Sequence, residues 1–326
     1  MILKDTLMTS YSNLFFKNSL AILIIFFTVL SISSQTVKYN NVPADLQLYP
    51  RNVQDTGNVI FNGEVQTVGY DSMYIEMFKN EVFQSRRSQV LSYTAGIAPF
   101  NLSHKIHAEC SEYKFKIFLN TTLVKTISNV TCGDVYLIMG QSNAIEVIPT
   151  FTYTNEYCRT FGLHTGTYNG DPYNPADTLW ALSKADVGGL TPGIPVVGVW
   201  GLQLQKMLKE TYNLPTCFIN GGRASGFLSI QLRNNGNPED LTSIYGRLLY
   251  RVRKAHVAND IKAIIFYGGE SDGYPPGYEN YLANWSIIHS QWQQDYPGYN
   301  KIFALQVRPG CSSGEELDQL REKQRQ

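Results

Sequence analysis

Five consecutive apolar residues, Val135 to Met139, stop abruptly at Gly140. A strand with one face in water alternates apolar and polar side chains, whereas a strand covered on both faces reads as an unbroken apolar run. Such strands belong to parallel sheets that helices cover on both faces. This segment therefore predicts an α/β domain built on a mainly parallel sheet.

The chain after Cys132 alternates between strand and helix patterns, as an α/β domain requires. Short apolar runs predict strands, and apolar residues at three- and four-residue spacing predict helices. The predicted strands are residues 216–219, 261–267 and 301–307, and the predicted helices are residues 201–210, 241–254 and 278–294. Residues 317–326 show a charged helical pattern at the end of the sequence.

The region before this domain has a different pattern of apolar and polar residues. Between residues 36 and 130, short strands with alternating side chains are separated by turn signals, and Asn62-Gly63 is a pair that favours a hairpin turn. Tyr113 to Asn120 shows the alternation clearly. We expect a small all-β sandwich over residues 35–130, with a domain boundary near Val130 to Cys132. His104 and His107 are isolated within it and suggest strand or loop positions, not a catalytic cluster.

The first 34 residues resemble a signal peptide. Lys4 and Lys17 precede an apolar run from Leu20 to Leu30, which small residues follow. The run is about half the ~20 residues that a membrane-spanning helix needs, so we expect cleavage near Ser34 in preference to a retained anchor. A secreted or periplasmic protein without a stable membrane anchor is predicted.

Charge and cysteine content exclude several partners and cofactors. The 27 basic and 27 acidic residues balance, which gives no electrostatic basis for binding nucleic acid. Five cysteines occur without CxxC spacing, so the sequence predicts no metal site and no cofactor. Cys217 lies in an apolar run and is expected to be buried; disulfide pairing and oligomeric state stay open.

Unusual loops follow three of the predicted strands. These are Gly140-Gln141-Ser142-Asn143, Asn220-Gly221-Gly222-Arg223 and Gly268-Gly269-Glu270-Ser271-Asp272. Active sites of open α/β sheets lie beyond the carboxyl ends of the strands, so these loops are expected to converge. A serine on a tight turn there can attack a substrate carbonyl, while nearby backbone N–H groups stabilise the oxyanion.

The segment Gly-Asp-Val-Tyr-Leu-Ile-Met-Gly-Gln-Ser-Asn, residues 133–143, resembles the nucleophile block of the sialate O-acetylesterase and acetylxylan esterase branch of the SGNH hydrolases. Gly221-Gly222 and Gly269-Glu270-Ser271-Asp272 are similar to the second and third blocks of that family, in the same order. The resemblance implies a flavodoxin-like three-layer fold over roughly residues 131–326. It also implies a catalytic Ser142; oxyanion donors Ser142, Gly222 and Gly268; and site-lining residues Gln141, Asn143, Gly221, Arg223, Gly269 and Glu270.

Two features depart from the family pattern. Gly268 stands where the family commonly has Gln, whose amide helps to bind the oxyanion. The family's Asp-x-x-His block is also missing, because no His follows His289. We therefore expect a C-terminally truncated chain with little esterase activity. His164, His256 and His289 are interpreted as non-catalytic, and Arg223 either contacts substrate or is a solvated surface residue.

These observations predict a carbohydrate O-acetylesterase that removes acetyl groups from sugars through a serine nucleophile. Acetylated carbohydrate is the expected partner, and the particular sugar stays open. The alternative is a catalytically inactive, esterase-like carbohydrate-binding module, which the two departures favour. A structural adhesion protein would leave the three loops unexplained.

Overall fold

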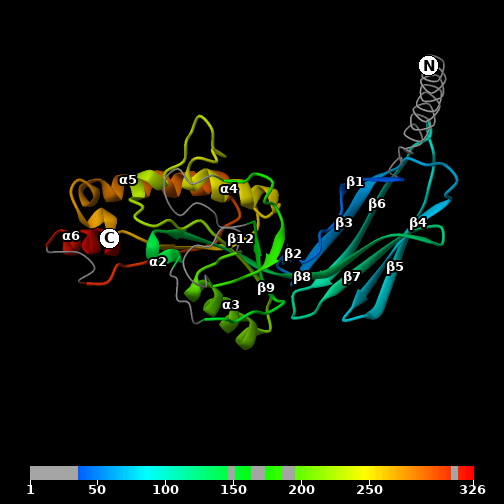
Figure 1. The fold of residues 1–326 in the computed structure, drawn as a ribbon, viewed down its shortest axis with the longest axis horizontal. Coiled ribbons are helices and arrows are strands. Elements are labelled where there is room, and N and C mark those ends of the chain that lie inside the picture. The colour runs from blue at the N-terminus through cyan, green and yellow to red at the C-terminus, as the bar shows by residue number, and fades with distance from the viewer. Residues whose placement is uncertain (1–35, 146–150, 163–172, 186–194, 310–314) are drawn as a thin grey trace, which may run out of the picture.

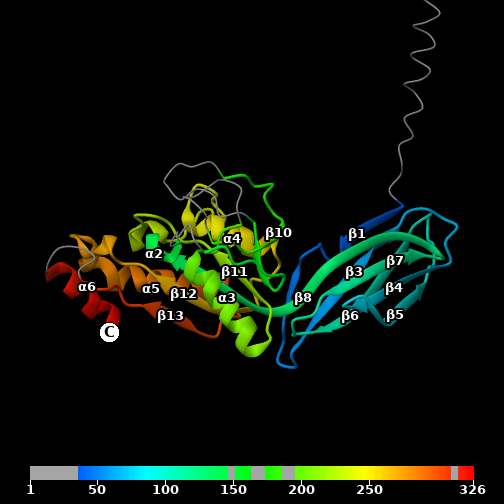
Figure 2. The same ribbon diagram turned by 60° about the horizontal axis from the view of Figure 1, so that its bottom comes forward.

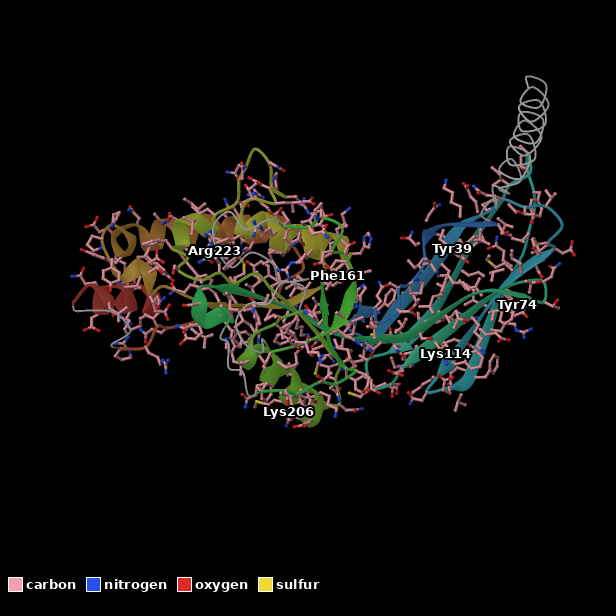
Figure 3. All side chains as sticks on the ribbon, in the orientation of Figure 1. Tyr39, Tyr74, Lys114, Phe161, Lys206 and Arg223 are labelled. Atoms are coloured by element: carbon pink, nitrogen blue, oxygen red, sulfur yellow. The ribbon has the colours of Figure 1, made fainter. Side chains whose placement is uncertain are left out.

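The computed structural model describes residues 36–145, 151–162, 173–185, 195–309 and 315–326. The predicted signal peptide, His164 and Cys311 lie outside these residues. Figure 1 shows a β-rich part and an α/β part lying side by side, and Figure 3 locates Tyr74 and Lys114 in the first and Arg223 and Lys206 in the second.

Two antiparallel sheets face each other in the N-terminal part. One sheet has the order β1-β3-β6, and in the other β5, β4 and β7 precede the first half of β8. Their inward side chains form one core, in which the rings of Phe61 and Phe115 lie 5.2 Å apart. The strands are β1 (Val37–Asn41), β3 (Thr56–Val65), β4 (Ser72–Lys79), β5 (Val82–Val90), β6 (Ala98–His107), β7 (Tyr113–Leu119) and β8 (Thr122–Gly140).

The hairpin turn predicted at Asn62-Gly63 is wrong. Both residues lie inside β3, where they pair with Asn101 and Phe100 of β6. Gly63 has an extended backbone, and a Cβ there would come within 2.1 Å of the Lys38 carbonyl oxygen of β1. The glycine therefore allows the neighbouring strand β1 to approach closely at this position. Long-range strand pairing overrides the local turn preference.

One long strand, β8, runs through both parts of the molecule (Figure 2). Its first half pairs antiparallel with β7, whereas residues 134–140 pair in parallel with β11 and β12. Between these halves, β2 (Leu48–Pro50) pairs with residues 131–133. Arg51 then forms a bidentate pair with the buried Asp134, at 2.7 and 2.8 Å. The expected boundary near Cys132 is thus a continuous strand with changing partners, and no linker separates the two parts.

The α/β part has a central sheet with the order β10-β9-β11-β8-β12-β13, in which β10 alone is antiparallel to its neighbour. Helix α3 packs on one face, while α4 and α5 pack on the other (Figure 1). The strands are β9 (Cys158–Phe161), β10 (Trp180–Leu182), β11 (Thr216–Asn220), β12 (Ile261–Tyr267) and β13 (Ile302–Leu305). The helices are α2 (Ser142–Ile145), α3 (Val199–Tyr212), α4 (Ile244–Lys254), α5 (Gly277–Asp295) and α6 (Glu315–Arg325), with 3₁₀ turns η1 (Leu228–Gln231) and η2 (Ser271–Gly273).

Alternate side chains of β8 explain why its apolar run is unbroken. Val135, Leu137 and Met139 pack with α4 and α5, whereas Ile138 packs with α3. The structure thus confirms a strand covered on both faces. Strand β13 is shorter than the predicted segment 301–307, and three of its four residues are exposed.

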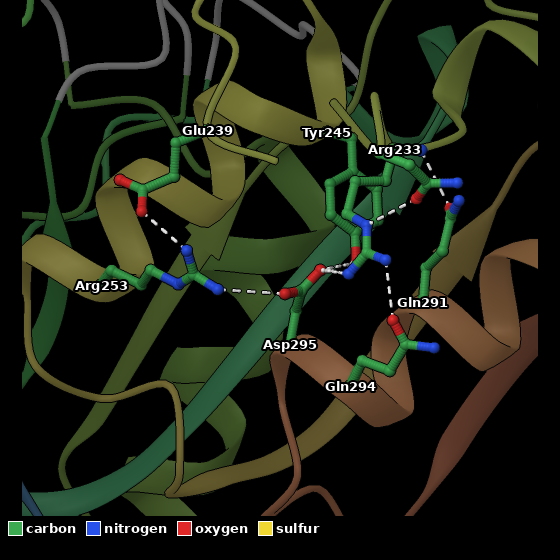
Figure 4. Close-up of polar contacts among 8 residues, drawn as sticks. Arg233, Glu239, Tyr245, Arg253, Gln291, Gln294 and Asp295 are labelled. Carbon is green, nitrogen blue, oxygen red and sulfur yellow. Dashed lines mark hydrogen bonds and ion pairs between the residues drawn. The ribbon is translucent and has the colours of Figure 1, made fainter. Parts of the chain in front are cut away.

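Around Asp295, a polar cluster connects α4, α5 and the segment after η1 (Figure 4). The buried carboxylate accepts hydrogen bonds from Arg233 at 2.8 Å, Arg253 at 3.1 Å and the Tyr245 hydroxyl at 2.8 Å. Arg253 also pairs with Glu239 at 2.7 Å. Because this carboxylate on α5 binds side chains from α4 and from the segment after η1, the cluster stabilises the helical layer.

Four cysteines fall within the described residues, and all are free thiols. Cys217 is fully buried, as predicted, and burial raises its thiol pKa. No helix in the described part of the chain is long and apolar enough to span a membrane.

Candidate functional site

The three loops identified in the sequence follow adjacent strands of the central sheet. Strand β8 lies between β11 and β12, and all three run parallel. Their carboxyl ends therefore meet at one edge, where the Arg223 N–H donates to the Gly140 carbonyl at 3.0 Å and the Gln141 N–H donates to the Tyr267 carbonyl at 3.0 Å. The structure brings the predicted loops into direct contact.

Gly140 ends β8 and starts the turn that presents Ser142. Its φ of +130° lies in a region that side chains disfavour, and a Cβ would come within 1.9 Å of the Tyr267 carbonyl oxygen. Ser142 is the first residue of the short helix α2; it is exposed, while Gln141, Ala144 and Ile145 around it are buried. The serine is thus the exposed residue of a turn that is otherwise packed into the protein.

Gln141 connects the turn that carries Ser142 to the third loop, residues 268–272. Its side chain is only 4% exposed, and its Oε1 accepts hydrogen bonds from the backbone N–H groups of Gly269 and Ser271, both at 3.1 Å. The glutamine side chain therefore acts as structural support, with its carbonyl oxygen committed within the protein.

Asn143 and Glu270 make the second connection between these loops. The Asn143 side-chain amide donates to Glu270 Oε1, and the Asn143 carbonyl accepts from the Trp200 indole at 2.8 Å. The other oxygen, Oε2 of Glu270, is buried and has no hydrogen-bond partner in the described parts of the chain. These contacts fix both sides of the turn around Ser142.

Asn220, which the sequence analysis did not single out, holds the second loop. Its buried side-chain amide donates to the carbonyl oxygens of Ala144 at 2.9 Å and Val197 at 3.0 Å. Its Oδ1 accepts from the Gly222 N–H at 2.7 Å. An Asn before two glycines resembles an ordinary turn former in the sequence, so only its position after a buried strand hinted at this role.

The three predicted oxyanion donors differ in whether their N–H groups already donate a hydrogen bond within the protein. The Gly222 N–H donates to Asn220, whereas the N–H groups of Ser142 and Gly268 have no hydrogen-bond partner among the described residues. Gly221, placed in the predicted lining, donates its N–H to the Ile138 carbonyl at 2.8 Å. Two of the three predicted donors therefore remain available.

Gly268 also permits a close approach between loops. A Cβ at this position would lie 3.0 Å from the Gln141 nitrogen and 3.3 Å from the Gly140 Cα. A larger residue would press on the backbone that precedes Ser142. A glycine at this position thus matches the tight packing of the two loops.

Arg223 is 7% exposed, so the solvated-surface alternative is wrong for this arginine. The histidines within the described residues lie elsewhere than at the turn that carries Ser142. His104 is buried on β6 in the N-terminal part, and His289 packs against Tyr299. The Ser142 hydroxyl has no hydrogen-bond partner within the described ranges.

Asp272 gives the third loop an unusual carboxyl group. It is 1% exposed, and its two oxygens accept from the Leu228 N–H at 3.1 and 3.0 Å. Burial raises its pKa to about 6, although the Leu228 N–H acts in the opposite direction; the Glu270 carboxylate adds to the rise. Asp272 joins η2 to the start of η1.

No group of three or more His, Cys, Asp and Glu side chains within the described ranges could hold a metal ion. The arrangement is that of an exposed serine on a rigid turn with backbone donors beside it. Such a site can carry out acyl transfer when a proton acceptor is at hand.

Comparisons with known proteins extend the fold assignment. No protein-family model matches the sequence, and no curated protein matches it. Among solved structures, a carbohydrate acetylesterase from Xanthomonas citri is similar, with 15% sequence identity and a TM-score of 0.54. The match covers 89% of this chain and 66% of that protein, so the chain spans a little under two thirds of its length.

Two further structures are more distant. A protein from Arabidopsis thaliana shares 17% identity over 58% of this chain and 79% of its own, with a TM-score of 0.43. NanS shares 17% identity over 50% of this chain and 61% of its own, with a TM-score of 0.34. Of the three structures compared, the Xanthomonas structure has the similarity that bears on the fold, and it shows that this mixed α/β fold is like that of a carbohydrate acetylesterase.

Proposed function

We propose that this protein is an exported carbohydrate O-acetylesterase of the SGNH type, with Ser142 as its nucleophile. The observation that carries the proposal is the exposed Ser142 on a turn fixed at the carboxyl edge of the parallel sheet. The likeness to a carbohydrate acetylesterase fold supports the class of substrate. Sialate, xylan and other acetylated glycans are all compatible with this proposal.

In the proposed reaction, the Ser142 oxygen attacks the carbonyl carbon of an acetyl ester. The C–O bond to the sugar breaks, the sugar oxygen takes up the proton that the Ser142 hydroxyl loses, and acetyl-serine forms. Water then attacks this ester; one proton of that water restores the Ser142 hydroxyl, and acetic acid leaves. The N–H groups of Ser142 and Gly268 are the donors that would face the oxyanion at each step.

A catalytically inactive carbohydrate-binding protein is the second candidate. The observation that favours it is the commitment of the Gly222 N–H to Asn220, because loss of one oxyanion donor can cost about 10² to 10³ in rate. Under this alternative, acetylated sugars bind at the serine turn and are not hydrolysed.

The test is acetate release from acetylated sugars by the whole protein and by its Ser142→Ala variant. Ser286→Ala is the matched control, since Ser286 is an exposed serine on α5 whose hydroxyl bonds only to its own helix. Because the Ser142 hydroxyl has no hydrogen-bond partner within the described ranges, we expect slow release by the wild type, loss of that release in Ser142→Ala, and no change in Ser286→Ala.

Equal rates in the wild type and Ser142→Ala would remove Ser142 from the reaction. Binding of an acetylated sugar in preference to its deacetylated form, with no acetate released by either protein, would establish the binding alternative. The proposed export has a separate readout: terminal sequencing should find the mature protein beginning near Ser34 or Gln35, and recovery of an intact N-terminus in membranes would contradict it.

A further inference from the structure

A groove of about 380 Å³ lies in the β sandwich, in the part of the molecule that does not carry Ser142. Its walls come from β3, β4, β5 and β6. Met77 and Leu102 supply apolar surface, and most other lining side chains are polar. The volume falls within the range of roughly 300 to 1,000 Å³ that is usual for small-ligand sites.

His104 and Ser85 give this groove a fixed polar wall. The buried imidazole places Nε2 3.2 Å from the Ile75 carbonyl oxygen, which can only accept a hydrogen bond, so Nε2 carries the proton. Nδ1 is then the acceptor for the Ser85 hydroxyl at 3.3 Å. Burial lowers the pKa of His104, the hydrogen bond to the Ile75 carbonyl acts in the opposite direction, and the nearby Arg87 adds to the lowering. Both ring nitrogens are committed to hydrogen bonds within the protein.

Two cations of the groove have no acidic partner. Arg87 on β5 and Lys105 on β6 are exposed, and the side chain of neither forms an ion pair or hydrogen bond with another of the described residues. The adjacent Arg86 differs, because it pairs with Glu76 at 2.6 Å and covers the Tyr74 ring. On a chain whose formal charges balance, the groove is thus a local site of uncompensated positive charge.

Hydrogen-bonding side chains surround these cations. Asn58, Asn101 and Ser103 line the groove, and amide and hydroxyl groups can both donate to and accept from sugar hydroxyls. None of the residues that line the groove is Phe, Tyr or Trp, so the lining offers no such ring for stacking on a sugar. The groove has the chemistry for a charged, hydroxylated ligand.

We propose that this groove binds an acidic sugar unit, with Arg87 and Lys105 interacting with its carboxylate and the amide and hydroxyl side chains contacting its hydroxyls. The carbohydrate class of the ligand rests on the proposed function, whereas its negative charge follows from the groove itself. In this arrangement the sandwich holds an acidic glycan, and the serine turn acts on, or binds, its acetylated parts.

The test is calorimetric titration of the whole protein with a galacturonic acid trimer and with an α2,8-linked N-acetylneuraminic acid trimer. The fully methyl-esterified galacturonic trimer is the matched ligand without charge. We expect saturable binding of at least one acidic trimer, at least ~10-fold weaker binding of the methyl ester, and affinity that falls as salt is raised. Arg87→Ala combined with Lys105→Ala should weaken binding at least ~10-fold.

Lys38→Ala is the control variant, because it removes a positive charge of the same sandwich outside the groove. It should leave the dissociation constant within twofold. Arg87→Gln with Lys105→Gln retains side-chain length and replaces the alanine pair if that pair unfolds. Ser142→Ala should bind as the wild type does, which separates this proposal from the fate of the esterase proposal.

Failure of both acidic trimers to bind would overturn the proposal, as would equal binding of the methyl ester. Unchanged affinity in both groove variants would place the ligand elsewhere and also overturn it. Displacement of the trimer by an equal concentration of sodium sulfate would show a general anion site and reject the sugar ligand. In each of these cases, Ser142-dependent acetate release could still be observed.

Discussion

The side-chain amide of Asn220 donates to the carbonyl oxygen of Ala144 at 2.9 Å and so ties the end of β11 to the helix that begins with Ser142. The same amide donates to the Val197 carbonyl, two residues before α3 begins, and its oxygen accepts from the Gly222 N–H. One buried side chain therefore sets the relative positions of the nucleophile turn and the Gly-Gly turn.

Replacing Asn220 by Ala should destabilise the protein by about 2–4 kcal/mol, since two buried carbonyl groups and one N–H lose their partner. Asn220→Asp should be no less harmful, because a carboxylate oxygen would face the two carbonyl oxygens. Urea unfolding measures both changes. Asn259→Ala, at an exposed position, is the control and should change stability by less than about 0.5 kcal/mol. A neutral Asn220→Ala would mean that this network does not hold the turn.

Gly140→Ala should be more harmful than Gly268→Ala. At Gly140 the backbone conformation and the Tyr267 carbonyl both oppose a side chain, and we expect a loss of at least ~2 kcal/mol. At Gly268 the nearest atom would be 3.0 Å away, so a loss of about 1 kcal/mol is expected. Thermal unfolding compares the two with Gly236→Ala, whose nearest neighbour is 3.5 Å away. The reverse order at Gly140 and Gly268 would contradict this packing.

The sequence predicted elements well where one physical pattern dominated. Residues 261–267 were expected as a strand and form β12, and the helix predicted at 278–294 is α5, residues 277–295. The hairpin turn predicted at Asn62-Gly63 was wrong because these residues pair with β1 and β6. A local turn signal carries no information about such long-range pairing. The continuity of β8 was hidden for the same reason, since its two halves have different side-chain patterns.

For the candidate site, the sequence predicted which loops meet, but it did not predict the hydrogen bonds between them. The three loops meet, as their positions after parallel strands required. The commitments of individual groups could not be predicted, because hydrogen bonds such as Gly222 to Asn220 depend on local side-chain geometry. Gln141 appeared as a lining residue in the sequence, while the structure shows it fastening two loops together.

Asp295→Ala should destabilise the helical layer by about 3 kcal/mol. The change leaves Arg233 and Arg253 without their shared carboxylate and removes the acceptor of the Tyr245 hydroxyl. Glu210→Ala is the control, because it breaks an exposed pair with Lys206 on α3 and should cost at most about 0.5 kcal/mol. Chemical denaturation distinguishes the two. Similar small effects from both variants would show that the buried cluster contributes no more than a surface pair.

Asp272 should make stability depend on pH in the mildly acidic range. Its pKa is raised from 3.8 to about 6 in the folded protein, so the folded state binds more protons than the unfolded state between these values. Its contribution to stability is therefore largest below pH 4, falls as the pH rises to about 6, and is constant above that. The shift corresponds to about 3 kcal/mol between the two limits.

Asp272→Asn removes this titration while keeping an oxygen that can accept from the Leu228 N–H. We expect the difference in unfolding free energy between the wild type and Asp272→Asn to change by up to about 3 kcal/mol between pH 4 and pH 7, with the wild type losing stability relative to the variant. Asp318→Asn, a substitution at an exposed carboxylate of α6, is the control for stability and should change the unfolding free energy by less than about 0.5 kcal/mol. A difference for Asp272→Asn that stays constant with pH would show that the Asp272 carboxyl titrates in its ordinary range.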